Sequence, residues 1–185
     1  MIKSFQYHYL LLYFLLPLLI ISAPACLVFN KISYEIVLNE DRSGTATVYI
    51  SDITSDATDS EAFAQDTAGL FTQMLTSDEF IEEMKNEGRF ISSRKLIVNG
   101  DNLDGEVKYN FKIITDIENI AHEDGFYFLT LDPADSVIST NGELIKSKDY
   151  KRILWDDKLK ILKFEMFSAE TYAYRKLIPY YKKQE

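Results

Sequence analysis

Alternating apolar and polar residues open the folded part of the chain and predict a pair of strands. Apolar side chains recur at every second position over 32–38 and again over 46–50, which is the period of a strand with one buried face. Between these runs, Asn39, Asp41 and Gly44 have turn chemistry, because Asn and Asp bond their own backbone and glycine accepts a positive φ. The sequence therefore predicts a β-hairpin whose turn places Gly44 at a positive φ.

The period lengthens to three and four residues over 59–87, which predicts an acidic helical insert. Its apolar stripe contains Phe63, Leu70, Phe71, Met74 and Leu75. The run 76–79 is typical of a capping box that opens a second helix, and Gly88 is suited to ending that helix. Because the stripe is too apolar to face water, we expect the insert to cover a sheet face. The cover is either tightly packed or a lid over a groove for an acyl chain or peptide.

Strand periodicity returns after the insert, at 90–98 and at 107–113. These two stretches predict a second hairpin. A short helical turn is expected at 117–121, and the run 125–131 is apolar and aromatic enough for a central strand.

The last third of the chain predicts two more hairpins. Asn141-Gly142 is typical of a two-residue turn, here between strands at 136–140 and 143–146. The stretches 153–155 and 160–167 predict the next hairpin, with a turn of charged residues between them.

A closing helix is expected from Ser168, a suitable cap, as far as Leu177. The whole pattern predicts an α+β fold, in which an antiparallel β-sheet built from hairpins is covered on one face by two or three helices. We expect a single domain over 26–185, because a chain of 185 residues is long enough for one proper core and too short for two.

The first 25 residues predict export. After Lys3, the run 9–21 is uninterrupted and apolar, and small residues follow it up to Cys26. This is the layout of a secretory signal peptide, and a Cys at that place is lipidated in bacterial lipoproteins. We therefore expect cleavage between Ala25 and Cys26, with lipid such as palmitate on Cys26. Two alternatives stay open: ordinary cleavage that releases a soluble periplasmic protein, or a retained helix within 4–30 that spans the bilayer.

Composition narrows the function classes. The chain has 20 basic and 29 acidic residues and a net charge of −9, which argues against a nucleic-acid partner and against adsorption to anionic lipid through charge alone. It has a single Cys, which excludes a disulfide within the chain and a zinc site built from several cysteines.

A resemblance to a known family adds to this interpretation. The run from Cys26 through the first hairpin, with its turn Asn39-Glu40-Asp41-Arg42-Ser43-Gly44, resembles the start of LppM-like bacterial lipoproteins. The acidic insert, the return over 90–114 and the late Asn-Gly turn followed by a Trp-ended strand also look similar. The resemblance covers most of 26–185. It implies an α+β fold on an antiparallel sheet and a cell-envelope location, and it brings no catalytic residues.

Candidate chemistry is sparse in 26–185. His122 is the one histidine there, since His8 lies in the leader, and one histidine cannot supply the paired ligands of a zinc or iron site. The acidic series within 52–61 offers oxygen ligands for Ca²⁺ but lacks the spacing of a calcium loop, and acidic residues ahead of a helix are favoured by its dipole in any case. We expect no metal and no cofactor.

These observations predict a lipid-anchored cell-envelope protein, facing the periplasm or the outer surface, with a binding or structural role. Its expected partners are the membrane and a hydrophobic ligand or envelope protein, with no nucleic acid. The alternative is an envelope hydrolase that uses surface carboxylates or His122. An apolar cleft favours binding, whereas converging carboxylates, or His122 against a serine, favour catalysis.

Overall fold

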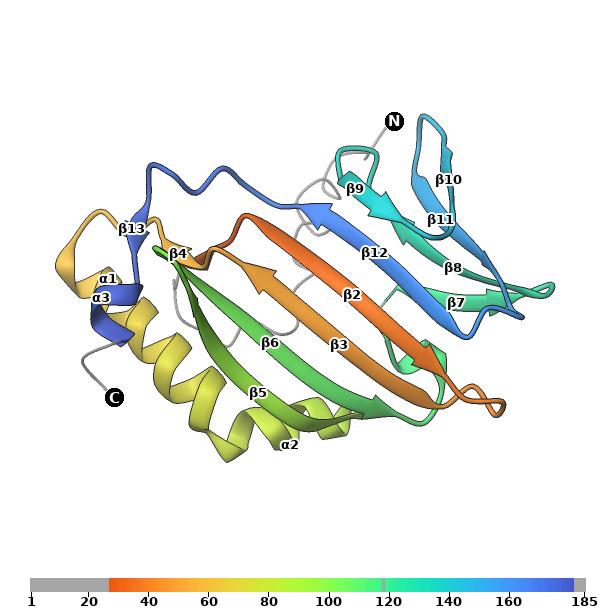
Figure 1. The fold of residues 1–185 in the computed structure, drawn as a ribbon, viewed down its shortest axis with the longest axis horizontal. Helices are drawn as coiled ribbons and strands as arrows, with labels where there is room; N and C mark the ends of the chain where they lie inside the picture. Colours follow the sequence, from red (N-terminus) through yellow and green to blue (C-terminus); the bar gives the residue numbers. More distant parts are fainter. Residues whose placement is uncertain (1–26, 118, 182–185) are drawn as a thin grey trace, which may run out of the picture.

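The structure, a computed structural model, describes residues 27–117 and 119–181 (Figure 1). The predicted fold class is confirmed, because the chain is an α+β arrangement made mostly of antiparallel sheets. Both early hairpins are present as adjacent strand pairs in the largest sheet. That sheet contains, in spatial order, β5 (Arg89–Asn99), β6 (Asn102–Phe111), β3 (Gly44–Ser51), β2 (Lys31–Leu38), β12 (Ile161–Phe167) and β9 (Ser136–Thr140).

Two smaller sheets complete the β-structure of the described residues. One contains, in order, β10 (Glu143–Lys146), β11 (Lys151–Asp156), β8 (Phe126–Leu131) and β7 (Ile120–Glu123). The run 125–131 is thus a central strand, as predicted, because β8 lies between β11 and β7. The other sheet joins β1 (Leu27–Val28), β4 (Thr54–Ser55) and β13 (Arg175–Lys176).

The acidic insert is helical, as predicted, and consists of α1 (Ser60–Ala68), the π-helix η1 (Gly69–Met74) and α2 (Asp78–Asn86). The Asp59 carboxylate accepts hydrogen bonds from two backbone N–H groups at the start of α1, and the Ser77 hydroxyl accepts one at the start of α2. These caps satisfy donors that a helix start leaves unpaired. Gly88 follows α2 at φ 83°, the left-handed conformation that ends many helices.

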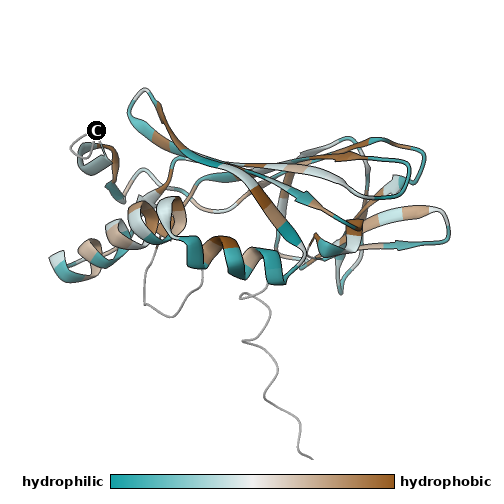
Figure 2. Ribbon diagram, turned by 90° about the horizontal axis from the view of Figure 1, so that it is seen from below, coloured by the Kyte–Doolittle hydropathy of each residue, from teal (hydrophilic) through white to brown (hydrophobic). Residues whose placement is uncertain are grey.

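The helical insert and the four-stranded sheet lie against the same face of the six-stranded sheet (Figures 1 and 2). At one end of that face, Ile50 of β3 lines a hollow together with Leu70 and Phe80 of the insert. At the other end, the Trp155 ring of β11 lies 6.0 Å from the Phe164 ring of β12. One apolar core runs beneath both covers. Every second residue of the six strands points away from this core, and those residues are mostly polar.

The Asn141-Gly142 turn does not close a hairpin, which corrects the prediction. β9 pairs with β12, whereas β10 pairs with β11, so the dipeptide carries the chain from one sheet to the other. The Asn141 Oδ1 accepts from Trp155 Nε1 at 2.9 Å and from the Lys163 N–H at 2.8 Å, and its Nδ2 donates to the Ile161 carbonyl at 2.8 Å. Gly142 fits because a Cβ there would lie 2.6 Å from Trp155 Nε1.

Three further elements differ from the prediction. β11 and β12 form no hairpin, since they belong to different sheets. The helical turn expected at 117–121 lies earlier, as the 3₁₀-helix η2 (Ile114–Asp116), and β7 begins at Ile120. The segment 168–177 contains β13 instead of the expected helix. Thr171 Oγ1 and Lys176 Nζ donate hydrogen bonds to the Asp52 carboxylate, and these bonds hold the segment along the sheet of β1, β4 and β13. The short α3 (Ile178–Tyr181) follows.

The first turn uses two of its predicted residues as expected. The Asn39 Nδ2 donates to Ser43 Oγ at 2.9 Å, and the Ser43 N–H donates to Asp41 Oδ1 at 3.1 Å. The hydrogen bonds from Ser43 lower the pKa of Asp41. The positive φ of this turn, however, belongs to Arg42, at 66°.

Gly44 has a different role from the one predicted. It lies in β3 and is not among the residues with positive φ. A Cβ at this position would overlap the Val37 carbonyl oxygen and lie 2.7 Å from the Phe111 ring. Gly44 is therefore required by close packing between adjacent strands, not by its backbone conformation.

Candidate ligand-binding site

An apolar slot lies between the helical insert and the six-stranded sheet. It contains ≈ 570 Å³ of empty space including its open mouth, but the centre of a water molecule can move in only ≈ 50 Å³ of it. Its walls come mainly from apolar side chains, among them Leu27, Phe29, Leu70, Met74, Phe80 and Leu96. Apolar walls of this kind are typical of sites for hydrophobic ligands.

The sheet wall of the slot follows from the strand pattern. In the register, Gly105 of β6 pairs with Ile50 of β3 on one side and with Leu96 of β5 on the other. The aliphatic side chains of Ile50 and Leu96 therefore flank Gly105, which has no side chain. A Cβ at Gly105 would lie 3.2 Å from Ile53 Cδ1, so the glycine allows Ile53 to pack closely against β6 at the floor of the slot.

The opposite wall is formed where α1 gives way to η1. Leu70 and Met74 of this π-helix line the slot, whereas the Phe71 ring packs 5.7 Å from the Tyr181 ring of α3. Phe63 likewise packs against α3, away from the slot lining. One part of the predicted stripe is thus tightly packed, and another part covers a hollow. Short π-helices are rare and are often found at functional sites.

Arg94 connects this wall to the sheet. From β5, its Nη1 donates to the carbonyl of Met74 at 3.0 Å and to that of Ser77 at 2.8 Å. Its guanidinium lies 5.9 Å from the centroid of the Phe80 ring. These contacts hold the junction of η1 and α2 against β5, and Arg94 is itself part of the slot wall.

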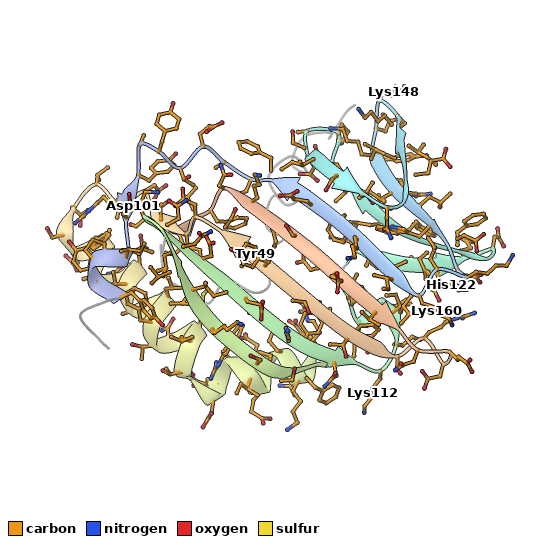
Figure 3. All side chains as sticks on the ribbon, viewed as in Figure 1. Tyr49, Asp101, Lys112, His122, Lys148 and Lys160 are labelled. Carbon is orange, nitrogen blue, oxygen red and sulfur yellow. The ribbon has the colours of Figure 1, made fainter. Side chains whose placement is uncertain are left out.

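A larger polar basin, with ≈ 850 Å³ of empty space including its open mouth, lies on the outer face of the same sheet, around Tyr49 of β3 (Figure 3). The Asp104 carboxylate is buried there and accepts hydrogen bonds from the Tyr49 hydroxyl, from Asn99 Nδ2 at 3.0 Å and from the Asp52 N–H at 2.8 Å. Burial, together with the Asp104 carboxylate, raises the pKa of Tyr49 to about 12. The sequence pattern missed this network because its members come from separate strands.

The acidic series within 52–61 is used for structure. The Asp52 carboxylate accepts from Thr171 Oγ1 and, at 2.7 Å, from Lys176 Nζ, and Asp59 caps α1. Within 27–117 and 119–181, no group of three or more His, Cys, Asp or Glu is arranged to hold a metal ion.

His122 of β7 lies at the far end of the molecule from the slot (Figure 3). Its Nε2 is 3.3 Å from Asp157 Oδ2, and its ring centroid is 5.0 Å from that of Tyr127. Burial raises the pKa of Tyr127. A carboxylate orients a histidine but is not the serine that the hydrolase alternative requires, so this contact gives that alternative no nucleophile.

The predicted cleavage and lipidation residues, Ala25 and Cys26, lie outside the described residues, as does the apolar run 9–21. The structure begins at Leu27, and Leu27 is part of the slot wall. The predicted anchor is thus covalently adjacent to the candidate site.

No protein-family model, curated protein or solved structure matches the chain. The resemblance to LppM-like lipoproteins therefore stays a prediction from the sequence. Among the residues that the structure describes, no helix is both long enough and apolar enough to cross a membrane.

Proposed function

We propose that the protein is a lipid-anchored cell-envelope protein whose domain binds a hydrophobic ligand in the apolar slot. The slot carries this proposal, since a concave site with apolar walls is the usual form of a site for a hydrophobic ligand. The free space is small, since the centre of a water molecule can move in only ≈ 50 Å³ of the slot. This small space favours an alkyl chain over a ring system.

The anchor half of the proposal rests on the sequence before the domain. An apolar run and then small residues precede the sole Cys of the chain, which is the order expected of a lipoprotein signal. The domain itself is acidic and unsuited to binding anionic lipid through charge, so a covalent lipid on Cys26 would supply the attachment. The expected location is the periplasmic or outer surface of a membrane.

Metabolic labelling tests the anchor. Radiolabelled palmitate should enter the wild-type protein and should be absent from Cys26→Ser, because the only thiol of the chain is the attachment point. Equal labelling of the two proteins would contradict lipidation at Cys26.

A photoreactive fatty acid tests the slot. Added to the full-length Cys26→Ser protein and illuminated, it should label peptides that contain Leu70, Met74 or Leu96. Leu96→Phe adds bulk inside the slot and should reduce this labelling. Val98→Phe is the matched control on the same strand, because Val98 is 39% exposed and is not part of the slot wall. Labelling that is equal in the two variants would refute binding in the slot.

A further inference from the structure

We infer that an acyl chain of the protein's own N-terminal lipid occupies the apolar slot. The inference rests on the proposed function, because it names the ligand of the same site and requires lipid on Cys26. The bound hydrophobic group would then be part of the anchor and not a free molecule.

The position of the first residues that the structure describes carries the inference. Leu27 and Phe29 both belong to the slot wall. β1 is held in place by β4, through the pairs Leu27 with Ser55 and Val28 with Thr54, and the Thr54 hydroxyl donates to the Val28 carbonyl at 3.1 Å. Consecutive Cα atoms are about 3.8 Å apart, so a lipid on the sulfur of Cys26 starts one residue from a fixed part of this wall.

Tethering gives this chain an advantage over any free ligand. A group joined to its site by a short flexible link has an effective concentration of the order of millimolar. The glyceryl group and first methylenes of a lipid on Cys26 are such a link, since Leu27 is already at the site. A slot with any affinity for alkyl chains would therefore be filled first by the lipid of its own chain.

The space in the slot selects an acyl chain over a retained leader. A helix formed by the run 9–21 would be about 20 Å long and 10–12 Å across with its side chains, which is far more volume than the ≈ 570 Å³ of empty space in the slot and its open mouth. An alkyl chain is only one methylene wide and needs much less space.

The surrounding bilayer does not cancel the advantage. For the chain itself, a move from bilayer to slot exchanges one apolar environment for another, so the hydrophobic effect changes little. The slot walls, however, lose contact with water only when the slot is filled. The half-buried side chains of Met74 and Leu75 are therefore the part of the system that gains from occupancy.

Crosslinking from the anchor tests the inference in the complete protein. Cells that express the full chain are supplied with a fatty acid carrying a diazirine and a terminal alkyne, so that the probe is built into the lipid on Cys26. After illumination of intact cells, the probe should be recovered on peptides containing Leu70, Met74 or Leu96 of the same molecule. Leu96→Phe should lose most of these crosslinks, and Val98→Phe should retain them. Gly105→Ala is a second slot-filling change, with a smaller side chain, should Leu96→Phe fail to fold.

Each other outcome overturns the inference. A probe found on Cys26 whose crosslinks lie only in membrane lipid or in other proteins would show that the chain stays outside the slot. Crosslinks that are equal in the Leu96→Phe and Val98→Phe proteins would show contact without occupancy. A leader that is retained, with no probe on Cys26, would leave no acyl chain to bind. If the added fatty acid still labels the slot of Cys26→Ser in any of these cases, only the inference fails and the slot remains a binding site.

Discussion

Replacing Asn141 by alanine should be among the more destabilising single changes outside the apolar core. Asn141 lies where the chain crosses from β9 of one sheet to β10 of the other. Its side chain makes three hydrogen bonds, to the indole N–H of Trp155, the backbone N–H of Lys163 and the carbonyl of Ile161. Alanine removes all three while leaving both sheets intact.

The expected loss follows from the burial of each partner. Trp155 is 1% exposed, so its indole N–H is left without a partner away from water, which costs about 1–3 kcal/mol. The bonds to Lys163 and Ile161 are at exposed positions, where water replaces the lost side chain and the cost of each is at the low end, roughly 0.5 kcal/mol. The free energy of unfolding should therefore fall by about 2–4 kcal/mol.

Urea denaturation of residues 27–185 measures this loss, and Trp155, the single Trp of the chain, reports the transition by fluorescence. Asn141→Asp keeps both acceptor bonds but places a carboxylate oxygen against the Ile161 carbonyl, so it should still be destabilising, by less than Asn141→Ala because the Trp155 N–H keeps its partner. Asn110→Ala is the exposed control, because its Oδ1 only accepts from Thr45 Oγ1, and it should cost less than about 0.5 kcal/mol. A loss below about 1 kcal/mol for Asn141→Ala, with an unchanged m-value, would refute the idea that this side chain joins the sheets.

Three further changes test the fold. Gly44→Ala should cost at least about 2 kcal/mol in a thermal melt, because its Cβ overlaps the Val37 carbonyl oxygen. Phe71→Ala should lower the free energy of unfolding by ~3–5 kcal/mol, since this ring is 4% exposed, and a urea midpoint close to wild type would show a loose cover instead. The pKa of Tyr49 rises from 10 to about 12 through burial and Asp104, so the fold favours the protonated phenol. The stability gained from this is complete below pH 10 and is lost as pH rises towards 12, and Tyr49→Phe should flatten that fall in urea midpoints measured across this range.

The sequence predicted the elements that are determined by residues close together in the chain. Strand alternation at 32–38, the helical period of 59–87 and the stop at Gly88 each depend on residues a few positions apart, and all three are present. The capping box predicted over 76–79 is replaced by a simple cap at Ser77, one residue later than the box places it. Such signals are strong because the side-chain period and the caps act within one element.

Strand partners were predicted less well, because pairing is a tertiary property. The dipeptide Asn141-Gly142 has the residues of a tight hairpin turn, yet its chemistry serves a crossing between sheets. Both interpretations require a small residue and an amide. The two interpretations differ only in the groups that face the dipeptide, here the Trp155 ring and the Leu154 carbonyl near Gly142. The spacing of residues in the sequence does not encode these tertiary contacts. Gly44 shows the same limit, since strand packing and a positive φ both select glycine.

The candidate site was predicted in outline only. The apolar stripe indicated that the insert covers a sheet face, but not that Phe71 would be packed while Met74 would border a hollow. That division depends on the π-helix of η1, which rotates the stripe part-way along the insert, and on α3, which supplies Tyr181. Neither is encoded in a window of a few residues.

Two features at the slot act against stability, and they occur together. Gly105 lies in β6, an interior strand, where glycine loses more conformational freedom on folding than any other residue. The π-helix η1, directly across the slot, has a backbone geometry that is uncommon in proteins. At Gly105, however, a Cβ would lie 3.2 Å from Ile53 Cδ1, so close packing against Ile53 also favours glycine here. Local costs of this kind are expected at functional sites, and both features belong to the slot wall.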